Sequence, residues 1–138
     1  MGSVFLEHWN SRELTDYNTI VYAHNMNDGS MFAEIKQYRD QEYAQQHPYV
    51  YILNDAGAFR YEVFAAYEAD VESSTYGLSF NQSKTRINFL EEASKNSDIS
   101  MQIEPALTDR VLTLSTCTGT GYSSRWVVQA RLKMIYTA

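Results

Sequence analysis

The chain has a single cysteine, Cys117, which ends a segment predicted to be a strand over residues 109–117. Alternate side chains of a strand share a face. One face therefore carries Val111, Thr113, Ser115 and Cys117, and the other carries Leu112, Leu114 and Thr116. The two leucines mark the second face as core, so we expect the thiol on the more polar face. A thiol at that place is compatible both with a small buried side chain and with a catalytic nucleophile.

An arginine stands where the next predicted strand begins. Residues 125–135 (RWVVQARLKMI) alternate in polarity, and only the polar loop 118–124 separates them from Cys117. If the two strands pair antiparallel through this loop, Arg125 and Cys117 lie at neighbouring strand ends. A guanidinium beside a thiol favours the thiolate and can stabilise a developing oxyanion. The alternative is an arginine in solvent, the usual state of an isolated charge.

Three histidines offer a general acid or base: His8, His24 and His47. His24 ends the predicted strand 19–24 (TIVYAH) and precedes a turn, a place where catalytic side chains are commonly held. His8 and His47 are most simply surface residues. A cysteine and a histidine together suffice for acyl transfer, but their separation along the chain neither supports nor excludes a contact.

The elements that would position these residues follow from hydrophobic periodicity and turn signals. A helix is predicted from residue 31 to about residue 46, ended by Pro48, and another over 85–94. Residues 54–57 predict a hairpin, though not of the tightest two-residue kind. Strands are predicted over 3–7, 19–24, 49–53, 58–71, 109–117 and 125–135. One domain over residues 1–138 is expected, either α+β or a β-barrel with helical insertions.

Composition excludes several classes of function. Among 138 residues, Lys and Arg number 11 and Asp and Glu 17, which gives a net charge of −6. This acidic balance argues against a protein that binds duplex nucleic acid or a polybasic membrane-surface protein. Residues 119–124 superficially resemble a phosphate-binding loop, but a strand rather than a helix follows them. No cluster has metal-ligand spacing, so neither a metal nor a cofactor is expected.

Four segments together resemble one family. Residues 113–117 read TLSTC, and an arginine strand follows with Arg125 before Val127 and Val128. Residues 22–26 (YAHNM) and 28–32 (DGSMF) surround His24, and residues 2–6 read GSVFL. This order of motifs resembles the class B sortases, cysteine transpeptidases of the Gram-positive cell surface. The resemblance runs along nearly the whole chain.

The resemblance implies a mainly β fold with helical insertions, a sortase-like β-barrel that lacks its N-terminal helix and first strands. It implies Cys117 as nucleophile, His24 as general acid/base, and Arg125 as the residue that binds substrate backbone and stabilises the oxyanion. The residues expected to line the substrate groove are Ser115, Thr116, Thr118 and Tyr122.

The partners implied are a sorting-motif peptide of the NPxT type and an amine from a peptidoglycan cross-bridge or a pilin lysine. The implied location is the extracellular face of the membrane, with the anchor absent from this chain.

Departures from the family pattern leave alternatives open. Ala23 replaces the usual glycine before the histidine, and the loop after Cys117 carries no acidic residue. The chain begins at the GSVFL strand, so exposed sheet edges and a homo-oligomer formed through them are expected. A Cys–His hydrolase that releases the acyl group to water is one alternative. A catalytically silent fragment that binds peptide or self-associates is the other.

Overall fold

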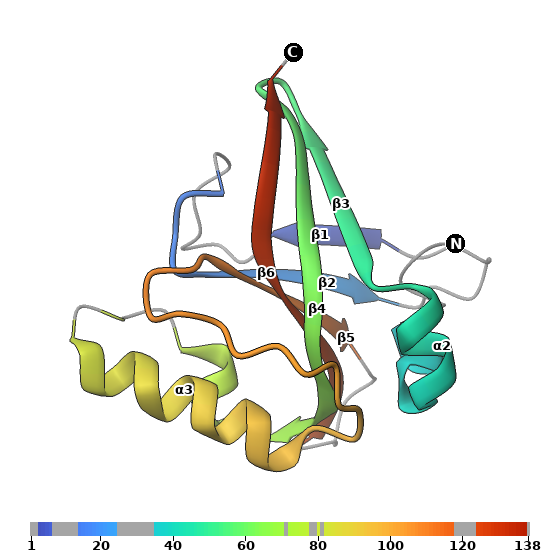
Figure 1. Cartoon of the computed structure of the whole chain (residues 1–138), viewed down its shortest axis with the longest axis vertical. Coiled ribbons are helices and arrows are strands. Elements are labelled where there is room, and N and C mark those ends of the chain that lie inside the picture. Colours follow the sequence, from blue (N-terminus) through green and yellow to red (C-terminus); the bar gives the residue numbers. More distant parts are fainter. Residues whose placement is uncertain are drawn as a thin grey trace.

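A six-stranded sheet organises the molecule (Figure 1). The structure, a computed structural model, describes residues 3–6, 14–24, 35–70, 72–77, 80, 82–117 and 124–137. The strands are β1 (Ser3–Leu6), β2 (Asn18–His24), β3 (Tyr49–Asn54), β4 (Gly57–Asp70), β5 (Val111–Cys117) and β6 (Ser124–Thr137). Their order is β1-β2-β5-β6-β4-β3. Only β2 and β5 pair in parallel, and the other neighbours are antiparallel.

The mainly β fold expected from the sequence is confirmed. Each predicted strand appears within a few residues of its expected bounds, because β-branched and aromatic residues dominate these segments. Over the described residues the sheet is open, and β1 and β3 form its two edges. Within that part of the chain no helix is long and apolar enough to cross a membrane.

The expected helix over residues 31–46 is wrong in detail, because two shorter helices occupy its described part. These are the 3₁₀ helix η1 (Ile35–Arg39) and the α-helix α2 (Gln41–Gln46). Asp40 interrupts them with an extended backbone, and its carboxylate accepts a hydrogen bond from the Glu42 N–H at 3.0 Å. Asp40 therefore caps a new helix instead of continuing the first. Residues 31–34 lie outside the described residues.

The hairpin between β3 and β4 is tighter than the sequence predicted. Asn54 pairs with Gly57, so only two residues form the loop. Gly57 has φ +142°, and a Cβ atom there would lie 1.9 Å from the Tyr136 carbonyl oxygen. Glycine alone tolerates both the conformation and the close approach, which is why the turn closes within two residues.

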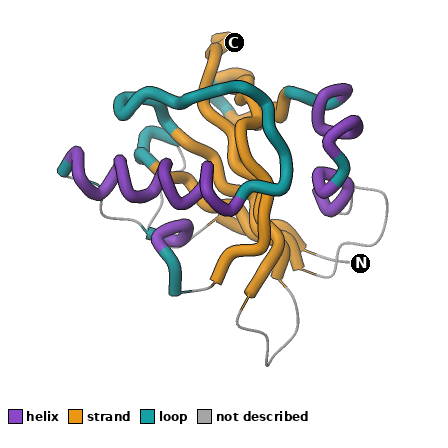
Figure 2. Tube along the Cα trace, turned by 60° about the horizontal axis from the view of Figure 1, so that its bottom comes forward, coloured by secondary structure: helices purple, strands orange, loops and turns teal. Residues whose placement is uncertain are grey.

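Helices cover both faces of the sheet (Figures 1 and 2). The helix α3 (Ser83–Asn96), longer than predicted, and the 3₁₀ helix η2 (Ser74–Tyr76) cover one side. The cluster beneath them contains Phe64, Ala65, Tyr67, Ala69, Phe80, Phe89, Ala93, Val111 and Val127. The opposite cluster packs against η1 and α2 and includes Val21, Ile35, Tyr38, Ala44, Leu112, Leu114, Trp126 and Val128. Val111–Thr116 of β5 and residues 126–130 of β6 are therefore buried on both faces, whereas residues 133–137 of β6 are exposed.

Candidate active site

The strands β2 and β5 end together. Their parallel register pairs Tyr22 with Ser115 and His24 with Cys117, the last pair at the carboxyl ends of both strands. Since alternate residues share a face, the backbone positions of Tyr22, His24, Ser115 and Cys117 lie on the face that α3 and η2 cover. The structure thus brings the backbone positions of the predicted nucleophile and the predicted general base to the same end of the sheet, where β2 and β5 finish. Their side chains are outside the described part of the structure.

Arg125 lies at the same end of the sheet, near the start of β6. The antiparallel pairing of β5 and β6 runs from Val111 with Arg131 to Ser115 with Val127. Continued by one more step on that face, this register sets Cys117 opposite Arg125. On its other side, Arg125 pairs with Ala69 of β4. The backbone therefore arranges His24, Cys117 and Arg125 on three consecutive strands, as the sequence predicted for Arg125 and left open for His24.

The Arg125 side chain is half-buried, and its Nε atom is fully buried. This N–H has no hydrogen-bond partner, and no ion pair to Arg125 occurs among the described residues. A buried donor without a partner is uncommon, because its desolvation is not compensated. The Arg125 guanidinium therefore retains an unused hydrogen-bond donor at the end of the sheet where His24 and Cys117 end their strands.

Ser115 and Thr116, two of the residues expected to line the substrate groove, lie in the last part of β5. Both side chains are buried. The Ser115 hydroxyl donates to the Thr116 carbonyl at 3.2 Å and accepts from the Tyr76 hydroxyl at 2.7 Å. The Thr116 hydroxyl donates to the Trp126 carbonyl and accepts from the Trp126 N–H, both at 3.2 Å. Both hydroxyls therefore hold β5 in place, and the expectation that these residues line a substrate groove stays a prediction.

The sequence predicted that Thr113 and Ser115 share the more polar face of β5, but it did not predict that this face is covered. The face is polar but buried, since Tyr76 from η2 lies over it. The Tyr76 ring stacks on Tyr22, with centroids 6.3 Å apart and planes 4° apart. Tyr22 precedes His24 by two residues, so strand alternation alone could have assigned it to the site. Tyr76 comes from a segment without any periodic signal.

Two predicted site residues, Thr118 and Tyr122, lie outside the described residues, as does His8. His47 is exposed at the end of α2, and its Nδ1 atom lies 3.0 Å from the Tyr43 carbonyl oxygen. Within the described ranges no group of three His, Cys, Asp or Glu side chains could hold a metal ion.

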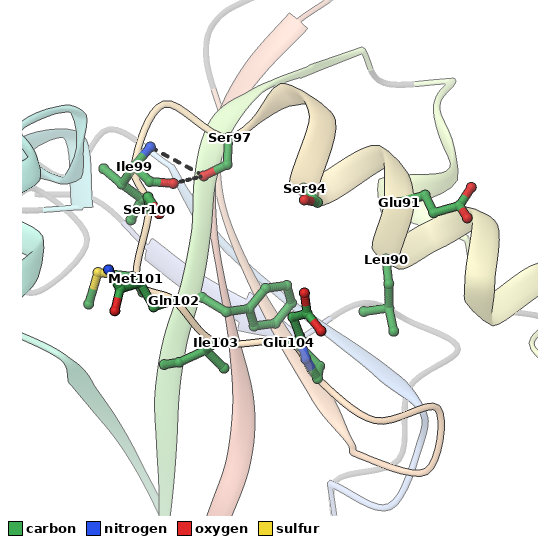
Figure 3. Close-up of a pocket in the computed structure, with 12 residues that line it drawn as sticks. Leu90, Glu91, Ser94, Ser97, Ile99, Ser100, Met101, Gln102, Ile103 and Glu104 are labelled. Atoms are coloured by element: carbon green, nitrogen blue, oxygen red, sulfur yellow. Dashed lines mark hydrogen bonds between the residues drawn. The ribbon is translucent and has the colours of Figure 1, made fainter.

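A cavity of about 820 Å³ lies apart from these residues, between α3 and the loop that follows it (Figure 3). Phe64 of β4 contributes to its lining. The other lining residues are Leu90, Glu91 and Ser94 of α3 and the loop residues Ser97, Ile99, Ser100, Met101, Gln102, Ile103, Glu104 and Pro105. The Ser97 hydroxyl stabilises the start of this loop by donating a hydrogen bond to the Ile99 carbonyl at 2.7 Å. None of the predicted site residues lines this cavity.

Comparison with known proteins agrees with this geometry. Residues 2–133 match the model of the sortase domain. Sortase B of Listeria monocytogenes is 33% identical over 133 residues, which are 95% of this chain and 54% of that protein. Sortase B of Staphylococcus aureus is 29% identical over 84% of this chain and 48% of that protein. The chain therefore spans about half the length of these relatives.

A solved structure shows the same fold. The Staphylococcus aureus sortase B–substrate complex superposes with a TM-score of 0.87 at 27% identity, covering 97% of this chain and 63% of that one. The family model covers nearly all of the present sequence, and the mainly β fold agrees with that of the solved structure. On these grounds the chain belongs to the sortase family, and its relatives of known name are sortases B.

Proposed function

We propose that this chain carries the catalytic residues of a sortase B-type cysteine transpeptidase. The observation that carries the proposal is the register pair His24–Cys117 at the ends of two parallel strands, with Arg125 at the start of the next strand. A nucleophile, an acid/base and an oxyanion donor are the three groups that covalent acyl transfer needs.

In the first half-reaction the Cys117 thiolate attacks the threonine carbonyl carbon of a sorting motif of the NPxT type. A C–S bond forms, and the carbonyl oxygen becomes an oxyanion that the Arg125 guanidinium stabilises. Protonated His24 then gives its proton to the leaving amine as the peptide C–N bond breaks. The products are a thioacyl-enzyme and the released C-terminal tail.

In the second half-reaction an amine attacks the thioester. His24, now neutral, takes the proton from the attacking amine, and Cys117 leaves as the thiolate. The amine belongs to a peptidoglycan cross-bridge or a pilin lysine, and the enzyme acts at the extracellular face of the membrane. The relative solved as a substrate complex supports a bound peptide as the first substrate.

The residues supporting this chemistry are not all in contact with substrate. Ser115 and Thr116 serve as positioning residues for Cys117, because their hydroxyls fix the last residues of β5. Thr118 and Tyr122 remain predicted groove residues on the loop that follows. No metal or cofactor takes part in either half-reaction as proposed.

The test is product analysis with a panel of NPxT-type peptides, with and without an added amine acceptor. Transpeptidation predicts a peptide–amine conjugate whose yield rises with amine concentration. Hydrolysed peptide at every amine concentration would instead identify a Cys–His hydrolase. Intact peptide throughout the panel would identify a silent fragment and contradict the proposal.

The homo-oligomer expected from the sequence stays a prediction. The edge strand β3 is the surface through which we expect two copies to pair. This edge strand has no charged residue, and Tyr49, Tyr51 and Leu53 are exposed by 42%, 48% and 77%. Neutral edge strands pair readily with a second copy. Light scattering measures the molar mass in solution. If β3 pairs with a second copy, Tyr51→Lys should lower the molar mass below that of the parent. An unchanged molar mass would contradict pairing through β3.

A further inference from the structure

Five buried polar side chains lie close together on the same face of the sheet as the candidate site. Each is at most 1% exposed, and they come from four strands and one 3₁₀ helix. We call them the polar ring: Asn18 of β2, Tyr67 of β4, Thr75 of η2, Thr113 of β5 and Gln129 of β6. Buried polar groups are costly unless each finds a hydrogen-bond partner, so a cluster of five calls for an explanation.

The hydrogen bonds of the polar ring form a closed circuit. Tyr67 donates its one hydroxyl proton to Gln129 Oε1 at 3.0 Å, so the Thr75 hydroxyl must donate to Tyr67, at 2.7 Å. Gln129 Nε2 donates to Thr113 Oγ1 at 3.2 Å, and Thr113 donates to Asn18 Oδ1 at 2.7 Å. Asn18 Nδ2 closes the circuit on the Thr75 carbonyl at 3.0 Å.

The circuit attaches η2 to the sheet. Asn18 Nδ2 also donates to the Gly77 carbonyl at 3.0 Å, so one amide holds the backbone at both ends of the segment 75–77. Thr75 adds its side chain to the same network. Loss of the Tyr67 hydroxyl leaves Gln129 Oε1 and the Thr75 hydroxyl without these partners, and loss of the Thr75 hydroxyl removes the donor to Tyr67.

The helix η2 in turn borders the candidate site. Its Tyr76 donates to Ser115 and stacks on Tyr22, and these residues precede Cys117 and His24 by two positions on the same face. A shift of η2 would therefore change the space beside the reactive strand ends and leave the strand pairing itself intact.

We propose that the polar ring is a positioning device that holds η2 as one wall of the active site. Its residues act on substrate binding through η2 and do not touch the reacting atoms. The kinetic consequence rests on the proposed transpeptidase function, whereas the fixing of η2 does not.

The experiment compares Tyr67→Phe and Thr75→Val with two controls. Thr75→Ser keeps the hydroxyl, and Tyr61→Phe makes the same chemical change in an equally buried tyrosine of β4 that packs in the opposite cluster. Amide hydrogen exchange of residues 72–77 is measured by mass spectrometry, together with KM for a sorting peptide and the rate of Cys117 alkylation by iodoacetamide.

Faster exchange at 72–77 and a KM raised roughly two- to tenfold are expected for Tyr67→Phe and Thr75→Val, the size of one lost hydrogen bond. Thr75→Ser and Tyr61→Phe should resemble the parent, and alkylation should stay unchanged in all four. Exchange equal in Tyr67→Phe and Tyr61→Phe overturns the proposal, as does raised exchange with an unchanged KM. Absence of turnover in the parent would defeat the proposed function alone, and hydrogen exchange would then decide whether the ring fixes η2.

Discussion

His24 and Cys117 are register partners in the only parallel pairing of the described sheet. Parallel neighbours end at the same edge, so two residues far apart in sequence share one position along the strands. Antiparallel pairing of β2 and β5 would instead separate the two residues by the length of a strand. This register is the structural basis of the proposal that Cys117 and His24 act together.

Cys117→Ala should abolish turnover and leave the fold intact. The substitution removes the only thiol of the chain, and loss of a covalent nucleophile typically costs a factor of about 10⁴ to 10⁶ in kcat. Steady-state kinetics and circular dichroism measure the two effects. Activity equal to the parent would rule out Cys117 as the nucleophile.

Arg125→Lys should remain badly impaired even though the charge is kept. A lysine ammonium cannot reproduce the planar fork of donors, and an oxyanion donor is typically worth roughly 3–4 kcal/mol. Arg131→Lys on the same strand is the matched control. It should keep kcat/KM near the parent value, and kinetics in the reverse order would assign the role to the other arginine.

Arg131→Lys should, however, lower stability. The Arg131 side chain is 23% exposed, and its guanidinium contacts Glu62 at 2.9 Å and Asp109 at 3.6 Å. A lysine keeps one of these contacts at best, so the free energy of unfolding should fall by about 1 kcal/mol. Urea denaturation measures this, and a midpoint equal to that of the parent would show that the pairs contribute nothing.

Trp126→Phe should destabilise the fold by about 1–3 kcal/mol. The buried indole N–H of Trp126 donates to the Ile35 carbonyl at 2.8 Å, and the Arg39 guanidinium lies 4.2 Å from the ring centroid. Phenylalanine removes the donor and leaves a buried carbonyl of η1 without this bond. A thermal midpoint unchanged from the parent would contradict the link between η1 and the sheet.

Stability should fall at alkaline pH. Burial raises the pKa of Tyr61 to about 12, against the opposing effect of Arg110, and burial likewise raises the pKa of Tyr17 to about 12. The folded state then holds protons that the unfolded chain releases near pH 10, so this stabilisation is complete below pH 10 and is lost as pH rises to 12.

Urea denaturation between pH 9 and pH 12 tests this dependence. The free energy of unfolding of the parent should decline across the upper part of that range. Tyr61→Phe should show a shallower decline, because one of the contributing tyrosines no longer titrates. Identical slopes in the parent and the variant would mean that the Tyr61 hydroxyl is not held neutral by the fold.

The sequence predicted the strands because periodicity is a local signal, and the roles of His24, Cys117 and Arg125, which rest on the family resemblance, stay predictions. It could not predict that β2 and β5 are parallel neighbours, since that pairing depends on the whole sheet. It could not predict the contact between Ser115 and Tyr76, because Tyr76 comes from η2, a short segment without any hydrophobic period. The break between η1 and α2 was missed because the apolar pattern continues past Asp40. That pattern does not show that the Asp40 side chain caps a new helix.

The intact mass of the protein after incubation with a sorting peptide tests most directly whether Cys117 and His24 act as one pair. A thioacyl adduct is expected, located on Cys117 by peptide mapping, and an added amine should remove it. His24→Ala should form this adduct far more slowly, and Cys117→Ala should form none. Equal rates of adduct formation in the parent and in His24→Ala would contradict the account.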